Sequence, residues 1–121
     1  MQPLHAQNTD VSPPETIQEA VEHLFRLIPN KEIAIIRRTS EEEFATNAIA
    51  TLGVYMREEW KLYSTESELG LFFMRNDIVS PDEMSEIILI CLWRRINGRD
   101  LQIDRLILDR MRFWDSVRSQ N

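Results

Sequence analysis

The sequence predicts a single compact all-α domain of five to six helices, in which the penultimate helix is apolar and buried. Three observations predict this fold class. Apolar residues recur at spacings of three and four, helix-capping motifs precede these runs, and the composition is that of a globular protein, with 43% hydrophobic and 28% charged residues among 121. A chain of this length buries about two thirds of its unfolded surface in one core.

The first helix is expected over residues 16–28, after a flexible lead-in formed by residues 1–13. Thr16 and Glu19 match a capping box, in which the threonine side chain accepts a hydrogen bond from the first turn. A second possible start at Ser12 competes with it. The lead-in lacks apolar periodicity, which is typical of a poorly ordered terminus.

The next two helices are separated by few residues. A short helix is expected over residues 31–38, although its isoleucines also fit a strand. Ser40 and Glu43 form a second capping box, which opens a longer helix to about Trp60. Gly53 lies inside this helix, where glycine costs up to ~1 kcal/mol relative to alanine. It indicates either the close approach of another element or a tolerated weak point.

The last three helices follow clear start signals or apolar spacing. Ser67 caps a short helix, and Ser80 caps a longer one that is expected to end at Ile96. Proline follows Ser80 at the first helical position, and two acids follow the proline, where the helix dipole favours them. Residues 87–93 are apolar on all sides, as expected of a buried helix. A final helix is expected over residues 103–117.

The order of these segments resembles an uncharacterised bacterial family of small all-helical domains. The resemblance is carried by PETIQEAVEHL, LGVYMREEWKLY, SELGLFF and SPDEMSEIILICLWRRING, which together span residues 14–98. The shared pattern is a Thr-hydrophobic-x-Glu-Ala start, Leu-Gly followed by Arg and Trp, and a Pro-Asp-acid-Met-Ser helix start. The resemblance implies a helical domain with no assigned reaction or ligand. Residues 14–121 then form one domain, with an extra helix at the C-terminal end.

Metal, cofactor and nucleophile chemistry are all disfavoured. The only histidines and cysteine are His5, His23 and Cys91, which lack the paired spacing of a zinc site. Three glycines offer no phosphate-binding loop, and one cysteine forms no internal disulfide. Cys91 is expected to be a small buried hydrophobe, and His23 a residue at the helix boundary rather than a base. We therefore expect no metal, no organic cofactor and no catalytic residue.

The charge distribution disfavours a general nucleic-acid binder, because the formal net charge is −6. Residues 91–121 nevertheless contain seven arginines and four aspartates. Helical spacing predicts that much of this charge is paired internally, by Arg105 with Asp109, Asp109 with Arg112 and Asp115 with Arg118. Docking against the acidic first helix is a second way to neutralise it.

Two groups of aromatic and arginine residues are candidate interaction sites, because these residue types dominate binding hot spots. The candidates are Arg57, Trp60 and Tyr63 near the end of the third helix, and Arg110, Phe113 and Trp114 on the last helix. For the first group, the alternative is that Trp60 closes the core and Arg57 covers it. In the second group, two adjacent aromatic residues cannot both face one core, so one is expected to be exposed or at an interface.

These observations favour a non-catalytic helical domain that acts by protein–protein interaction, as an adaptor, an immunity-like inhibitor or a regulatory subunit. Its partner is then another protein or a second copy of the chain. Two alternatives are a nucleic-acid-associated regulator that uses the arginine-rich C-terminal helix and a small enzyme with an unrecognised pocket. A membrane span is not expected, because no apolar stretch reaches about 18 residues. The expected location is the cytoplasm, or the periplasm if a signal peptide has been removed.

Overall fold

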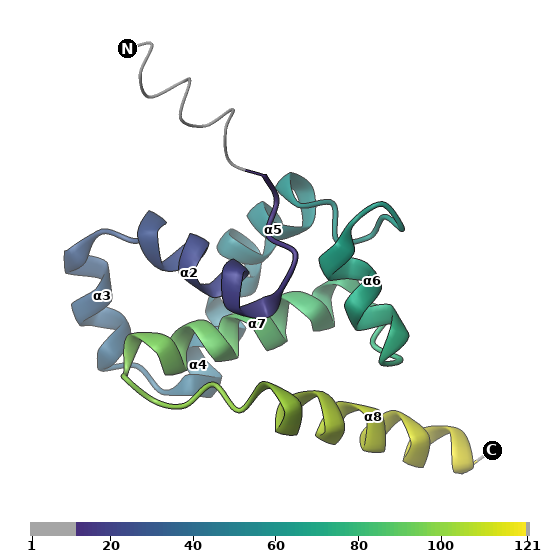
Figure 1. The fold of residues 1–121 in the computed structure, drawn as a ribbon. Helices are drawn as coiled ribbons and strands as arrows, with labels where there is room; N and C mark the ends of the chain where they lie inside the picture. The colour runs from purple at the N-terminus through teal and green to yellow at the C-terminus, as the bar shows by residue number, and fades with distance from the viewer. Residues whose placement is uncertain (1–11, 121) are drawn as a thin grey trace.

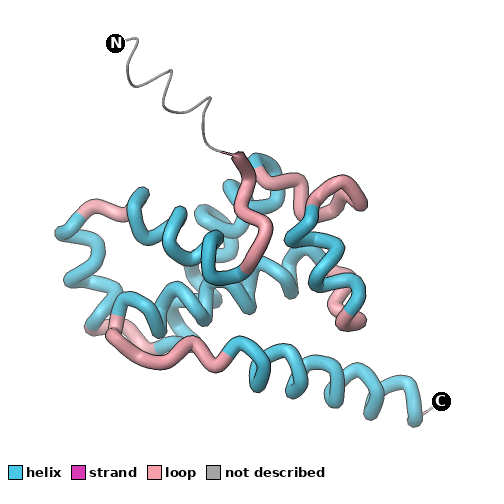
Figure 2. The backbone as a smooth tube through the Cα atoms, in the orientation of Figure 1, coloured by secondary structure: helices cyan, strands magenta, loops and turns pink. Residues whose placement is uncertain are grey.

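The computed structural model describes residues 12–120, and every regular element in that range is helical (Figures 1 and 2). The elements are α2 (Ile17–Leu27), α3 (Asn30–Arg37), α4 (Glu41–Ala48), the π-helical segment η1 (Ile49–Gly53), α5 (Val54–Glu59), α6 (Glu68–Arg75), α7 (Pro81–Ile96) and α8 (Ile103–Ser119). Because α4, η1 and α5 follow without a break, the described chain has six helical segments. The predicted all-α class is therefore confirmed, whereas most of the expected lead-in, residues 1–11, lies outside the described residues.

Four helices begin at the predicted caps. The side chains of Thr16, Ser40, Ser67 and Ser80 each accept a hydrogen bond from the backbone N–H three residues later, at 2.9–3.4 Å. This interaction satisfies an N–H group that has no partner inside the helix. The start at Thr16, rather than at Ser12, is the one that forms.

In the segment with two possible structures, residues 31–38, residues 31–37 are helical and form most of α3, and Arg38 is its C-cap. Ile33 and Ile36 are buried three positions apart, while Ile35 is 51% exposed. A helix places the first two on one face and the third on another, which alternation along a strand does not do.

α7 lies at the centre of the domain and packs most extensively against α4 and α2 (Figure 1). Ile87, Ile88, Leu89 and Leu92 have no exposed surface, so the helix is buried on several sides, as predicted. Cys91 is buried among them, and this burial raises the pKa of its thiol to about 12. The thiol is therefore protonated at neutral pH and acts as a hydrophobic side chain, as expected.

Gly53 lies in the π-helical segment that joins α4 to α5. A Cβ atom at this position would lie 3.0 Å from Nη1 of Arg57, one turn further along the same helix. The close neighbour of Gly53 is thus the guanidinium group of Arg57 and not a second helix, which corrects one of the two expectations for this glycine. The absence of a side chain leaves room for Arg57 to reach towards α7.

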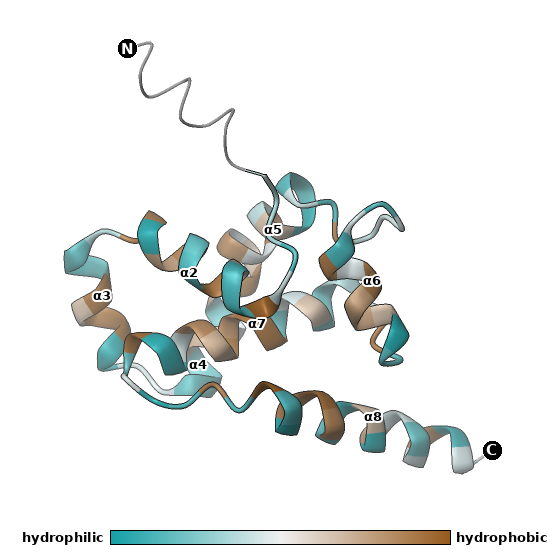
Figure 3. Ribbon diagram, viewed as in Figure 1, coloured by the Kyte–Doolittle hydropathy of each residue, from teal (hydrophilic) through white to brown (hydrophobic). Residues whose placement is uncertain are grey.

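α8 turns back after α7 and runs antiparallel to it along one edge of the domain (Figure 1). Its apolar residues occur in both halves of the helix (Figure 3). Ile107 is its single buried residue, while Ile103, Leu106 and Met111 are partly buried against the core. α8 therefore contributes much less to the core than α7 does.

We predict that Trp93→Ala lowers the free energy of unfolding by ~3–5 kcal/mol, because it removes a large side chain from the core. Trp93 is 8% exposed, and its indole Nε1–H donates a hydrogen bond of 2.7 Å to the carbonyl oxygen of Thr39. Urea unfolding followed by circular dichroism measures the loss. Trp93→Phe, which keeps much of the packing, should lose less. An unchanged unfolding midpoint in the alanine variant would contradict the central place of α7.

Candidate functional site

The first turn of α7 brings together residues from both candidate groups. Nη1 of Arg57 lies 3.1 Å from Oδ1 of Asp82, and Nη1 of Arg110 donates a hydrogen bond of 3.0 Å to Oε2 of Glu83. The sequence places these arginines more than 50 residues apart. The fold makes them neighbours because α5 and α8 both approach the N-terminal end of α7.

Glu83 holds α8 against α7. Its carboxylate accepts hydrogen bonds from Arg110 and from Nε1–H of Trp114, which lies 3.0 Å from both carboxylate oxygens. Nη2 of Arg110 also lies 3.2 Å from Oε1 of Glu86. Only 13% of the Glu83 side chain is exposed, so solvent screens these contacts less than it screens a surface ion pair. We call Glu83, Glu86, Arg110 and Trp114 the α7–α8 clamp.

Sequence analysis missed the role of Glu83. The sequence indicates only that Glu83 is an acid in the first turn of α7, where the dipole stabilises it. An isolated acid in that position carries no signal for a partner 27 residues away. The spacing of Arg110 and Trp114, four residues apart on one helix face, was the available hint that both contact one group.

Trp60 and Tyr63 separate into core and surface. Trp60 is 4% exposed and belongs to the core, which confirms the alternative that it closes the core. Arg57 is half-buried beside Asp82 rather than extended into solvent. Tyr63 is 60% exposed. The first candidate group is therefore not one continuous surface.

The two adjacent aromatic residues of α8 differ in exposure. Phe113 is 55% exposed, whereas Trp114 is half-buried and bound to Glu83. Their rings contact edge to face, with centroids 5.1 Å apart. The expectation that one of the pair is exposed is confirmed, and Phe113 is that residue.

Most of the C-terminal arginines contact acids or aromatic rings. Arg95 pairs with Glu22 of α2 at 2.6 Å, so the acidic first helix neutralises part of this charge as expected. Arg94 pairs instead with Glu41 of α4, at 2.8 Å. Two of the three predicted helical pairs form, between Arg105 and Asp109 and between Arg118 and Asp115. The third is wrong, because Asp109 pairs with Arg105 and Arg112 makes no ion pair with it among the described residues. The guanidinium of Arg99 lies over the ring of Trp93.

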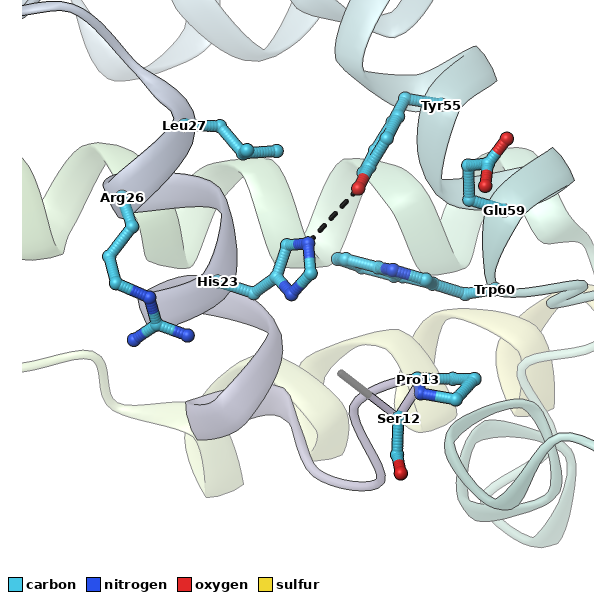
Figure 4. Close-up of a pocket in the computed structure, with 8 residues that line it drawn as sticks. All are labelled: Ser12, Pro13, His23, Arg26, Leu27, Tyr55, Glu59 and Trp60. Atoms are coloured by element: carbon cyan, nitrogen blue, oxygen red, sulfur yellow. Dashed lines mark hydrogen bonds between the residues drawn. The ribbon is translucent and has the colours of Figure 1, made fainter. Parts of the chain in front are cut away.

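A cavity of about 450 Å³ opens between α2 and α5 (Figure 4). His23 and Tyr55 point towards each other across it, and a hydrogen bond of 3.0 Å joins Nε2 of His23 to the Tyr55 hydroxyl. The ring of Trp60 meets the imidazole edge to face, at 5.3 Å between centroids. His23 thus sits at the boundary between core and solvent, as predicted from its place on the helix.

Electrostatics keep both groups of this pair neutral. Burial, together with the positive charge of Arg26, lowers the pKa of His23 below 6.5. Burial, together with the negative charge of Glu59, raises the pKa of Tyr55 above 10. A neutral imidazole and a protonated phenol near pH 7 can hydrogen-bond to a polar group at the cavity wall. In the structure they bond to each other, and so join α2 to α5.

Over residues 12–120, no group of three or more histidine, cysteine, aspartate or glutamate side chains is placed to hold a metal ion. Among the helices described, none is long and apolar enough to cross a membrane.

The fold defines an all-helical domain whose buried core, apart from Ile107, lies between Ile17 and Ile96. The same part of the chain matches the model of a protein family. The chain belongs to the family described as "Domain of unknown function (DUF6794)", whose model matches residues 13–96. The resemblance to an uncharacterised family over residues 14–98 is thereby confirmed. No curated protein and no solved structure matches the chain significantly. α8 lies beyond the matched residues.

We predict that the stability of the protein falls as the pH drops below about 6.5, with His23 as one cause. Because the pKa of His23 is lower in the folded chain than its ordinary value of 6.5, the unfolded chain binds a proton more readily. The contribution is complete above pH 6.5 and is lost as the pH falls through the lower, folded pKa. An NMR titration of the imidazole should give a midpoint below 6.5, and a midpoint above 6.5 would contradict the account. Urea unfolding of His23→Gln should show a weaker dependence on pH over this range.

We predict that Glu83→Gln lowers the free energy of unfolding by about 1–2 kcal/mol, because charge-assisted hydrogen bonds to Arg110 and Trp114 are weakened. Glu68→Gln is the matched control. Glu68 is an exposed acid in the first turn of α6, so it should lose only a dipole contribution of about 0.3–1 kcal/mol. Urea unfolding compares the two variants. Equal losses would show that the α7–α8 clamp adds nothing.

Proposed function

We propose that this protein is a non-catalytic domain that binds another protein, as an adaptor, an immunity-like inhibitor or a regulatory subunit. The contact surface is the outer face of α8. The observation that carries the proposal is the exposure of Phe113, a large aromatic side chain that is 55% exposed on a helix otherwise docked by its neighbour Trp114.

The outer face of α8 has the composition of a small binding patch. Leu108 is 40% exposed and adds a second apolar side chain on this helix. Arg105 and Arg112 are exposed on the same helix as these two residues. An apolar anchor with arginine around it is a common form of protein-binding surface, because aromatic and arginine side chains contribute most of the binding energy in many interfaces.

Charge pairing favours a protein partner over a nucleic acid. Arg94, Arg95 and Arg110 each contact a carboxylate from another helix, at 2.6–3.2 Å. Arginines held in this way are less available to replace the counterions of a phosphate backbone. The net charge of −6 acts in the same direction and would steer the domain towards a basic partner.

We predict that Phe113→Ser keeps the fold and removes the partner. The side chain is more than half exposed, so its loss should change the free energy of unfolding by less than about 1 kcal/mol. Val79→Ser is the matched control, because Val79 is 68% exposed outside α8. Circular dichroism checks the fold, and proteins that co-purify from the native cell are compared between wild type and the two variants.

The proposal expects a co-purifying protein that is lost with Phe113→Ser and kept with Val79→Ser. A partner that binds both variants equally would place the binding surface elsewhere. Strong, salt-dependent retention of the folded wild type on heparin would instead favour a nucleic-acid partner.

A further inference from the structure

The seat of α8 is an acidic and apolar surface on α4, η1 and α7. A cavity of about 600 Å³ remains there beside α8, and its lining includes Ala45, Ile49, Glu83, Glu86, Arg110 and Trp114. The seat supplies the carboxylates, and α8 supplies the guanidinium and indole groups that bind them. The surface therefore fits a helix that carries arginine and tryptophan four residues apart.

The buried core lies almost entirely outside α8. Every buried hydrophobic residue in the described chain except Ile107 lies between Ile17 and Ile96, within the residues that the family shares. α8 packs on this core mostly through partly buried apolar side chains and the α7–α8 clamp. Ile107 is the single fully buried residue that α8 contributes.

The hinge before α8 is short and contains an unfavourable backbone conformation. Residues 97–102 connect α7 to α8. Gln102 adopts φ 53° and ψ 47°, a left-handed conformation that costs free energy in a residue with a side chain. Gly98 has φ 68°, which glycine adopts without this cost. A short hinge under strain favours the exchange of the element that it connects.

We propose that the seat also binds α8 of a second copy of this chain, so that two chains exchange their C-terminal helices reciprocally. Glu83 and Glu86 of one copy would then bind Arg110 and Trp114 contributed by the other. The inference rests on the proposed function in treating α8 as the contact element, but it assigns a different face of α8 and a specific occupant.

The second copy is the occupant that the contacts favour. Its α8 presents the same arginine and tryptophan at the same spacing, so the exchanged pair keeps the contacts of the α7–α8 clamp. Opening the hinge frees Gln102 from its left-handed conformation, which the closed monomer retains. The exchanged dimer consequently keeps the helix contacts and loses the hinge strain, while Phe113 stays on the outer face.

Two charge-reversed full-length variants test the exchange. The seat variant carries Glu83→Lys with Glu86→Lys, and the helix variant carries Arg110→Glu. Each variant alone has like charges between seat and α8, whether α8 comes from the same chain or from another. In a mixture, the seat of each variant meets an α8 of opposite charge on the other chain. Arg112→Glu is the matched control for the helix variant. Arg112 is exposed, and its replacement makes the same charge change on the same helix without touching the seat.

The two variants are mixed in equal amounts, and their mass is measured by sedimentation velocity. The proposal expects monomers from each variant alone, dimers from the mixture, and fewer dimers when Arg112→Glu replaces the helix variant. A mixture that stays monomeric overturns the proposal, as does equal dimer formation with the control.

The oligomeric state of the wild type is a second measurement. It becomes the deciding test if circular dichroism shows that the seat variant is unfolded. A dimer fraction that rises with concentration and falls with Gln102→Gly supports the exchange, because glycine removes the hinge strain from the monomer. A wild type that is monomeric at every concentration tested overturns it in that case.

The two proposals fail separately. Exchange uses the inner face of α8, so Phe113→Ser should leave dimer formation in the mixture unchanged. Dimers in the mixture, together with partner binding that is insensitive to Phe113→Ser, would reject only the proposed function. A monomeric mixture with a partner that Phe113→Ser removes would reject only the exchange.

Discussion

The burial of α7 is the constraint on which the rest of the structure depends. Its middle residues have no exposed surface, so α2 and α4 must cover it on separate sides. Both ends of α7 then carry the polar contacts that fix its neighbours. Near the C-terminal end, Arg94 and Arg95 bind acids of α4 and α2, and at the N-terminal end Asp82 and Glu83 bind arginines of α5 and α8. α7 thus positions the other helices by apolar packing along its middle and by ion pairs at its two ends.

In this arrangement, α2 and α8 are attached to the core by different kinds of contact. α2 is joined to the core by buried apolar residues and by the pair of His23 with Tyr55, so it separates from α7 only when the core opens. α8 has one buried residue and is otherwise held by partly buried side chains and by the carboxylate of Glu83. Regions with few buried contacts open at lower free energy than the core does. The exposed Phe113 lies on this helix.

Local signals were sufficient to predict the helices and much of the core. Serine and threonine caps identified four helix starts, because a cap acts within three residues of the chain. The apolar run in α7 identified the central helix for the same reason. Sequence patterns did not predict that Glu83 binds Arg110 and Trp114, that His23 binds Tyr55, or what occupies the space beside Gly53. These contacts depend on how separate helices approach one another, and helix periodicity carries no such information. For α8, the sequence predicted only ion pairs within the helix, such as Arg105 with Asp109. Opposite charges also indicated contact with the acidic first helix, but the arginine that binds its Glu22 is Arg95 of α7.

The central claim is that α7 belongs to a core that unfolds as a unit, whereas α8 is attached to it and opens locally. Native-state hydrogen exchange of the full chain, resolved by residue, tests this most directly. The account predicts that amides in the middle of α7, such as those of Ile88 and Leu92, exchange only through global unfolding. Amides in the middle of α8, such as that of Met111, should exchange at a lower free energy that depends weakly on denaturant. Equal protection of the two helices, with the same dependence on denaturant, would contradict the account, because it would make α8 part of the cooperative core.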